Sequence, residues 1–206
     1  MSGVSRQDHW QNVYAAKREN EVSWFQDSAA PSLELIDGTG ATPHSHVVDI
    51  GGGASRLVDS LLAKGFNHLT VLDLSEAALR SAKARLGESA AKVEWIVADV
   101  TTWEPNRLYD VWHDRAAFHF LTDTADRAAY VDRLRRVLRP GGCAIIATFA
   151  LDGPERCSGL PVMRYDAASL GEALGGDFAL VETRRHLHTT PWQSAQQFQF
   201  SIFRRV

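Results

Sequence analysis

The sequence predicts an α/β fold: a doubly wound, mostly parallel sheet of seven strands, with helices on both faces and an antiparallel C-terminal hairpin. From His46 onward, short apolar runs alternate with segments of helical periodicity, a pattern typical of parallel strands joined by crossover helices. Three glycines directly follow the first apolar run. Near the C-terminus, the extended stretches 178–188 and 197–204 are separated by a turn at Thr190-Pro191, which predicts a hairpin at the sheet edge.

The individual elements follow from apolar spacing and from residues that start or stop helices. Each predicted strand is a short apolar run, and each predicted helix carries apolar residues three or four positions apart. Ser75 occupies an N-cap position, Gly65 and Gly87 stand where two helices should stop, and Pro140-Gly141-Gly142 should end a third. The predicted strands are 47–50, 69–72, 93–97, 109–112 and 143–149, and the predicted helices are 55–64, 75–86, 124–138 and 167–174.

The composition indicates one water-soluble domain. The 206 residues are 45% hydrophobic, and 22 Lys and Arg against 25 Asp and Glu leave a net charge of −3, which disfavours a nucleic-acid partner. The longest apolar stretch, around 143–151, is far below the roughly 20 residues of a membrane helix, and the first residues show no signal-peptide pattern. We therefore expect no membrane partner and a cytoplasmic location. Cys143 and Cys157 are too few for a disulfide scaffold or structural zinc, and no metal is expected.

Residues 1–45 are interpreted as an N-terminal lead and residues 46–206 as the main domain. The stretch 37–45, rich in Gly, Pro, Ser and Thr, is the only linker-like segment. The lead carries Trp10, Tyr14, Trp24 and Phe25, and these apolar rings must be buried against another part of the protein. Either the lead caps a ligand crevice or it packs on an exposed helix face.

The glycine turn indicates a nucleoside ligand. A buried strand runs into Gly51-Gly52-Gly53 and then a helix, so the backbone can approach a ligand without a side chain in the way. Asp73 ends the next strand, where doubly wound folds bind ribose hydroxyls. A pyridine dinucleotide and S-adenosylmethionine both satisfy this pattern. Arg56 stands where the dinucleotide fingerprint has its third small residue, and Asp49 would repel a pyrophosphate, so S-adenosylmethionine is favoured.

Four segments, in this order, resemble the class I S-adenosylmethionine-dependent methyltransferase family. They are Asp49-Ile50-Gly51-Gly52-Gly53, Asp73, Ala98-Asp99-Val100 and Arg139-Pro140-Gly141-Gly142. The resemblance implies a Rossmann-like fold, S-adenosyl-L-methionine as cofactor and S-adenosyl-L-homocysteine as product. It also implies ribose binding by Asp73 and contact of Asp99 with the adenine amino group. The expected cofactor-binding residues are Asp49, Gly51, Gly52, Gly53, Asp73, Leu74, Asp99, Val100, His113 and Trp24.

The stretch 112–120 is the candidate substrate wall, because loops after parallel strands line the ligand crevice. His113-Asp114-Arg115 resembles the Trp-Asp-Arg-Gly segment of thiopurine S-methyltransferases and a segment of some protein-lysine methyltransferases, with Ala116 in place of Gly. Asp114 and Arg115 could instead form a solvated ion pair. His119, between two Phe residues, is a candidate catalytic base or a core histidine.

The C-terminal third supplies two further candidates. His186 is a second candidate catalytic residue, because it shares a strand face with His188 and could form a metal or base pair with Gln197 or Gln199 across the hairpin; an edge-strand polar face is the alternative. The loop 152–161 is long enough to act as a lid and carries Cys157, which we interpret as an inert cysteine rather than a nucleophile.

These observations favour methyl transfer to a small-molecule acceptor, with a thiol or other soft nucleophile preferred. A thiol with a pKa of about 8.5 needs little help from a base, whereas a lysine with a pKa of about 10.4 must be deprotonated. The alternatives are a protein-lysine N-methyltransferase and a non-catalytic module that binds S-adenosylmethionine. The sequence leaves the choice between monomer and dimer open.

Overall fold

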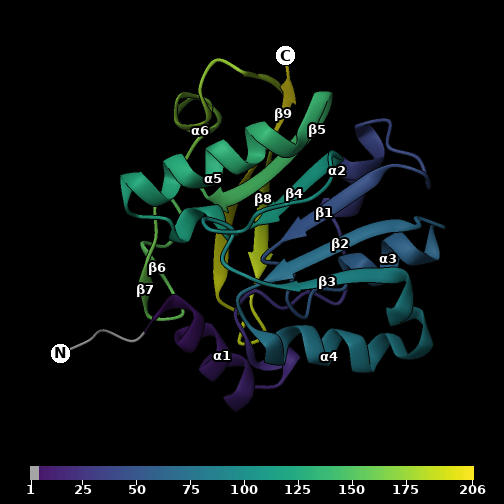
Figure 1. Cartoon of the computed structure of the whole chain (residues 1–206). Coiled ribbons are helices and arrows are strands. Elements are labelled where there is room, and N and C mark those ends of the chain that lie inside the picture. The colour runs from purple at the N-terminus through teal and green to yellow at the C-terminus, as the bar shows by residue number, and fades with distance from the viewer. Residues whose placement is uncertain (1–4) are drawn as a thin grey trace.

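A computed structural model describes residues 5–206 as a seven-stranded sheet flanked by helices (Figure 1). The first four residues of the N-terminal lead lie outside the described residues. The strand order is β3-β2-β1-β4-β5-β9-β8: the first five strands in this order run parallel, and β9 is antiparallel to both neighbours. The strands are β1 (His46–Ile50), β2 (His68–Asp73), β3 (Val93–Val97), β4 (Tyr109–Arg115), β5 (Leu138–Phe149), β8 (Phe178–Thr189) and β9 (Ala195–Arg205). The predicted fold class is confirmed.

The sheet carries a hydrophobic core on each face. One core joins the sheet to α5 (Thr124–Val137) and α6 (Ala167–Leu174), and includes the buried residues Trp112, Tyr130 and Leu170. The other joins it to α2 (Ser32–Gly38), α3 (Leu57–Ala63) and α4 (Glu76–Leu86). Because both faces are covered, the central strands are almost entirely apolar, as the sequence pattern predicted.

The N-terminal lead does not form a separate unit. Its α1 (Arg6–Ala16) has no fully buried residue and lies beside α4, where the Gln11 side chain accepts hydrogen bonds from Ser75 Oγ at 3.2 Å and Ala77 N at 3.1 Å. A 3₁₀ turn, η1 (Glu19–Glu21), follows, and then α2 places Leu35 and Ile36 in the same core as α3. The predicted boundary at 45/46 therefore cuts through one hydrophobic core, because α2 belongs to the main domain.

Several predicted boundaries required correction. Ser75 caps α4, and β3 and α6 have the predicted bounds. However, β4 extends three residues beyond the predicted Trp112. The predicted stop at Pro140-Gly141-Gly142 lies inside β5: α5 ends at Val137, the strand begins at once, and its pairing with β4 shifts between Tyr109 and Val111. These glycines therefore form an irregularity in a strand.

Shorter elements link the main helices and strands. A 3₁₀ turn, η3 (Phe118–Phe120), follows β4, and a second 3₁₀ segment, η2 (Gly87–Lys92), links α4 to β3. The loop after β5 forms a two-stranded ribbon of β6 (Arg156–Cys157) and β7 (Leu160–Pro161). Among residues 5–206, no helix has the length and apolar character needed to span a bilayer.

Candidate functional site

The glycine turn after β1 leaves no room for side chains. Gly51 and Gly53 adopt positive φ angles of 65° and 46°, which L-residues with a Cβ rarely adopt. A Cβ on Gly52 would lie 2.6 Å from Asp49 Oδ2 and 2.8 Å from Val71 Cγ1, closer than atoms can approach without displacement. All three glycines are therefore required by this geometry, and the exposed backbone can contact a ligand directly.

Asp73 lies at the end of β2 with its carboxylate buried at the edge of the turn. It is 7% exposed, and its Oδ1 accepts a hydrogen bond from Ser75 N at 2.7 Å. Burial, with a further contribution from the nearby Asp49 charge, raises the pKa of Asp73 to about 7 against the lowering effect of backbone N–H groups. A carboxylate held in this way is poised to accept hydrogen bonds from ligand hydroxyl groups.

Asp99 is held in place by the loop after β3 and by the N-terminal helix. Its Oδ1 accepts hydrogen bonds from Thr101 N at 2.8 Å and Thr101 Oγ1 at 2.7 Å. Its Oδ2 pairs with Arg6 Nη2 at 2.8 Å, and Arg6 also pairs with Asp126 at 2.9 Å. The Asp99 carboxylate thus caps the backbone turn that follows it. The Arg6 contact could not be predicted, because 93 residues separate the partners.

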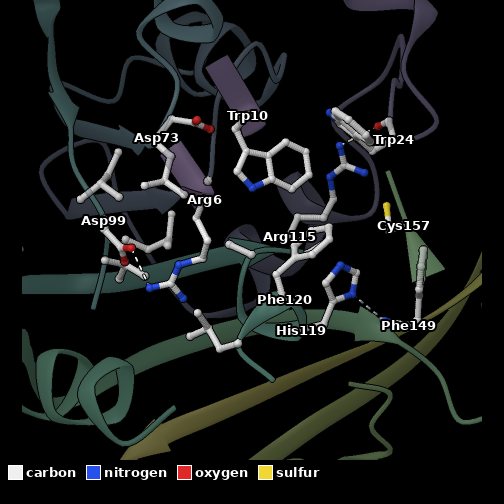
Figure 2. A pocket seen from close by; sticks show the side chains of 18 of the residues that line it. Arg6, Trp10, Trp24, Asp73, Asp99, Arg115, His119, Phe120, Phe149 and Cys157 are labelled. Carbon is white, nitrogen blue, oxygen red and sulfur yellow. Dashed lines mark hydrogen bonds and ion pairs between the residues drawn. The ribbon is translucent and has the colours of Figure 1, made fainter. Parts of the chain in front are cut away.

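One main cavity, enclosing about 870 Å³ of space that is open to solvent, joins these acids to the loops after β4 and β5 (Figure 2). Of the predicted site residues, its lining includes Trp24, Gly51, Asp73, Leu74, Asp99, Val100 and His119. We name the part near Asp73 and Asp99 the adenosine end. The part lined by Arg115, His119, Phe120, Phe149 and Cys157 is the acceptor end. Figure 2 shows Trp10 projecting between the two ends.

Asp49 and His113 lie in a second, smaller cavity that shares Gly51, Trp24 and Arg115 with the first. Both side chains are buried, and His113 Nδ1 lies 2.7 Å from Asp49 Oδ1. The other ring nitrogen lies 2.8 Å from Ser32 Oγ at the start of α2. The sequence predicted Asp49 and His113 at the site, but not Ser32, which is distant in the chain and has no motif. The hydrogen bonds from Ser32 through His113 to Asp49 fix the Asp49 carboxylate beside the glycine turn.

The aromatic residues of the lead cover the cavity. The ring of Trp10 meets Phe120 edge-on at a centroid distance of 4.9 Å and Trp24 at 5.5 Å. Trp24 Nε1 donates a hydrogen bond to Tyr14 Oη at 2.9 Å. Phe25 and Gln26 line the second cavity and do not line the main one. The lead thus forms one wall of an aromatic chamber, a surrounding that attracts a sulfonium cation by roughly 0.5–2 kcal/mol per well-placed ring.

His119 lies in η3, fully buried in the wall of the acceptor end. The Phe149 N–H donates to its Nδ1 at 3.3 Å, so in the neutral ring the proton is on Nε2, which has no hydrogen-bond partner. Burial lowers the pKa of His119 to about 3. The ring therefore presents an N–H donor and has no free basic nitrogen, contrary to its prediction as a catalytic base.

Asp114 and Arg115 do not form the solvated ion pair that was considered as an alternative. Asp114 is fully buried and accepts hydrogen bonds from Ala117 N at 2.7 Å, Phe118 N at 3.0 Å and Tyr130 Oη at 2.7 Å. Burial raises its pKa to about 6. Arg115 turns the other way, and its Nη2 donates to the Trp24 carbonyl at 2.9 Å. Ala116, the first residue after β4, has a φ of 71°, a left-handed conformation that glycine adopts without strain.

Two remaining candidates lie outside the cavity lining. His186, on β8, contributes to neither cavity, and its ring meets Phe200 edge-on at 6.1 Å. The structure therefore places this predicted catalytic residue on the edge strand and not at the site. Gly53 lies against the Asp73 carboxylate, since a Cβ on Gly53 would be 2.9 Å from Asp73 Oδ2. Within residues 5–206, no three His, Cys, Asp or Glu side chains are grouped to hold a metal ion.

Comparison with known families agrees with this geometry. Residues 47–142, from β1 to the irregularity in β5, match the model of a methyltransferase domain. This match, over 96 of the 206 residues, supports a class I S-adenosylmethionine-dependent methyltransferase. The matched region contains the glycine turn, Asp73, Asp99, Arg115 and His119, but neither the aromatic lead nor Cys157.

Curated relatives are similar to different extents of the chain around this methyltransferase domain. The ubiquinone biosynthesis O-methyltransferase of Rickettsia conorii is 22% identical over 79% of this chain and 55% of that protein. A malonyl-[acyl-carrier protein] O-methyltransferase of Ilyobacter polytropus is 27% identical over 52% of this chain and 40% of that protein. The chain spans about half the length of these two relatives. Thiocyanate methyltransferase 1 of Arabidopsis thaliana is 25% identical over 87% of this chain and 78% of its own length.

Solved structures share the fold of the methyltransferase domain and its flanking elements. The N-methyltransferase NodS from Bradyrhizobium japonicum, crystallised with S-adenosyl-L-homocysteine, has a TM-score of 0.74 at 17% identity, with 98% of this chain and 99% of that chain covered. At this identity the likeness shows the fold alone.

Proposed function

We propose that this domain transfers a methyl group from S-adenosylmethionine to a small-molecule acceptor, with a thiol or other soft nucleophile preferred. The observation that carries the proposal is the single cavity from Asp73 and Asp99 to the aromatic chamber at Arg115 and His119. The cofactor supplies a methyl group on a positively charged sulfur. Asp73 fits its ribose hydroxyls, and the glycine turn with Asp49 fits its methionine part.

The aromatic chamber supports an acceptor of limited size. Trp10, Trp24 and Phe120 form its walls and limit the size of a bound acceptor, so a nucleophile and a methyl group can be held about 3 Å apart in line. Rings suit the sulfonium better than a carboxylate would, since a carboxylate beside sulfur stabilises the positive ground state more than the transition state. The names of the relatives state methylation of thiocyanate, and O- and N-methylation of other molecules.

The protein-lysine alternative loses one of its two supports, which are the aromatic lead and a carboxylate near the lysine ammonium group. Asp114, the candidate for that carboxylate, is fully buried on β4, accepts hydrogen bonds from three donors and does not line the cavity. The non-catalytic alternative predicts tight cofactor binding without turnover with any acceptor.

Incubation of the protein with methyl-labelled S-adenosylmethionine and matched panels of thiols, amines and phenols tests the proposal. We expect label in the small-molecule fraction, with thiols the best acceptors, and binding of S-adenosyl-L-homocysteine by calorimetry. Label appearing only in added protein would favour the lysine alternative. Binding without turnover in every panel would favour the non-catalytic module.

A further inference from the structure

Among residues 5–206, the acceptor end of the cavity contains no side chain suited to remove a proton. The only free nitrogen of His119, Nε2, carries the ring proton, because the Phe149 N–H occupies Nδ1. Burial raises the pKa of the Cys157 thiol to about 11, so it stays protonated. The His119 ring and the Cys157 thiol therefore line this end of the cavity as X–H groups.

The acidic groups of the cavity belong to its other end. Asp99 uses both oxygens on Thr101 and Arg6. Asp73 lies at the glycine turn, where the proposed function assigns it to the ribose. Neither carboxylate belongs to the acceptor end, so neither is a general base for an acceptor bound there.

Arg115 is the charged group of the acceptor end. Within residues 5–206 it forms no ion pair with a carboxylate, and its one hydrogen bond is the 2.9 Å contact from Nη2 to the Trp24 carbonyl. A guanidinium has five N–H donors and keeps its charge in proteins, so most of its donors are free. Figure 2 shows its side chain between Trp24, Phe120 and Cys157. The Asp49 carboxylate in the adjoining cavity raises the pKa of Arg115 against the lowering effect of burial, but it forms no ion pair with the guanidinium. A cation with free donors in a largely apolar chamber attracts an anion.

We propose that the acceptor enters this site as a preformed anion, held by the Arg115 guanidinium, with the His119 N–H as an additional donor. This inference rests on the proposed function and specifies its substrate class: small thiolates and comparable soft anions. The acceptor's lone pair forms the bond to the methyl carbon as the carbon–sulfur bond breaks, and that electron pair stays on sulfur. Two opposite charges disappear, and no proton is released or taken up in the step.

The pH dependence of wild-type turnover tests the inference without any substitution. A series of aryl and alkyl thiols of similar size but different pKa is assayed under kcat/KM conditions, with thiocyanate as an acceptor ionised throughout. We expect kcat/KM to rise tenfold per pH unit up to the pKa of each thiol and then level off, so that the break follows the acceptor. A break at one fixed pH for all thiols would reveal a base in the enzyme and overturn the inference.

Substitution of Arg115 tests where the anion binds. Arg115→Met, which removes the charge and keeps most of the length, should raise KM for thiolates and thiocyanate about 10- to 100-fold, as expected for loss of a charge-assisted contact. Arg115→Lys should recover part of the loss. Arg80→Met is the matched control, because its side chain is 68% exposed on α4. Its KM should equal the wild-type value.

The same variants distinguish the acceptor from the cofactor's own carboxylate, which is also an anion and lies near Arg115 if the second cavity holds it. Calorimetry with S-adenosyl-L-homocysteine should give the same Kd for Arg115→Met as for the wild type. A weakened Kd with unchanged acceptor KM would assign Arg115 to the cofactor and overturn the inference. Failure of the wild type to bind S-adenosyl-L-homocysteine or to methylate any acceptor would instead contradict the proposed function itself.

Discussion

The two ends of the main cavity are built in different ways. At the adenosine end, short chain segments place backbone and carboxylates: the glycine turn after β1, Asp73 at the end of β2 and Asp99 after β3. At the acceptor end, side chains from β4, η3, β5 and β6 meet, and their hydrogen bonds determine what each can do. The first end can thus be recognised from motifs. The second can be understood only from contacts between distant residues.

The largest effect is expected where backbone alone forms the adenosine end. Gly52→Ala places a Cβ 2.6 Å from Asp49 Oδ2 and forces this carboxylate, with its His113 contact, out of position. We expect the Kd for S-adenosyl-L-homocysteine to rise at least about 100-fold, which corresponds to about 2.7 kcal/mol. Calorimetry measures it. Gly176→Ala, where nothing lies within 4 Å, is the control and should bind normally. Equal affinity of the two variants would contradict the conclusion that the turn after β1 has no room for a Cβ at Gly52.

The next prediction concerns the support of the acceptor end. Asp114 accepts hydrogen bonds from Ala117 N, Phe118 N and Tyr130 Oη, which fix the turn between Arg115 and His119. Asp114→Asn turns an amide N–H₂ toward some of these donors and should lower the free energy of unfolding by about 2 kcal/mol. Urea denaturation gives this value. Asp132→Asn, at a side chain 47% exposed on α5, is the control. An unchanged urea midpoint for Asp114→Asn would mean that this turn does not depend on the carboxylate.

A smaller effect, dependent on pH, is expected at Asp73. In the free protein burial raises its pKa to about 7, whereas ribose hydroxyl donors favour the ionised form. Binding of S-adenosyl-L-homocysteine at pH 6 should therefore release a proton. Affinity should be full above pH 7 and weaken as the pH falls below it, by up to tenfold per unit. Asp73→Asn should bind about tenfold more weakly at pH 8 and lose this pH dependence.

The measurement for Asp73 is calorimetry in two buffers of different ionisation enthalpy, which counts the protons released on binding. The wild type should show proton release at pH 6 and little at pH 8. If the Asn variant released as many protons at pH 6, another group would be responsible and the ribose assignment would lose its support.

The contrast between the two ends explains what the sequence could predict. β3 and α6 were predicted with the observed bounds because a local apolar run and the Asp166 cap define them. β4 was predicted to end at Trp112, since His113 and Asp114 are polar residues typical of a loop. In the structure both side chains are buried. His113 is hydrogen-bonded to Asp49 and Ser32, and Asp114 accepts a hydrogen bond from Tyr130. Those partners lie 16 to 81 residues away, so no local pattern could reveal them.

The same limit applies to the candidate catalytic residues. His119 was identified from its apolar neighbours, which predict burial, but its tautomer depends on the Phe149 N–H, 30 residues away. His186 was chosen for its alternation with His188, a pattern that gives the strand face but not the distance to the site. Arg6 was overlooked because a lone arginine in a helix carries no signal until Asp99 and Asp126 are seen beside it.

The smallest effect is expected at Cys157, the acceptor-end residue interpreted from sequence as inert. Its thiol is 8% exposed and burial raises its pKa to about 11, so little thiolate exists at neutral pH. Cys157→Ala should change kcat/KM by less than about threefold, since an uncharged thiol adds a weak donor and some packing. Alkylation of Cys157 by iodoacetamide, located by peptide mass analysis, should be slow at pH 8 and accelerate toward pH 11. Rapid labelling at pH 7 together with loss of turnover in the alanine variant would assign the thiolate a catalytic role, and the acceptor end would then contain a nucleophile in place of an anion site.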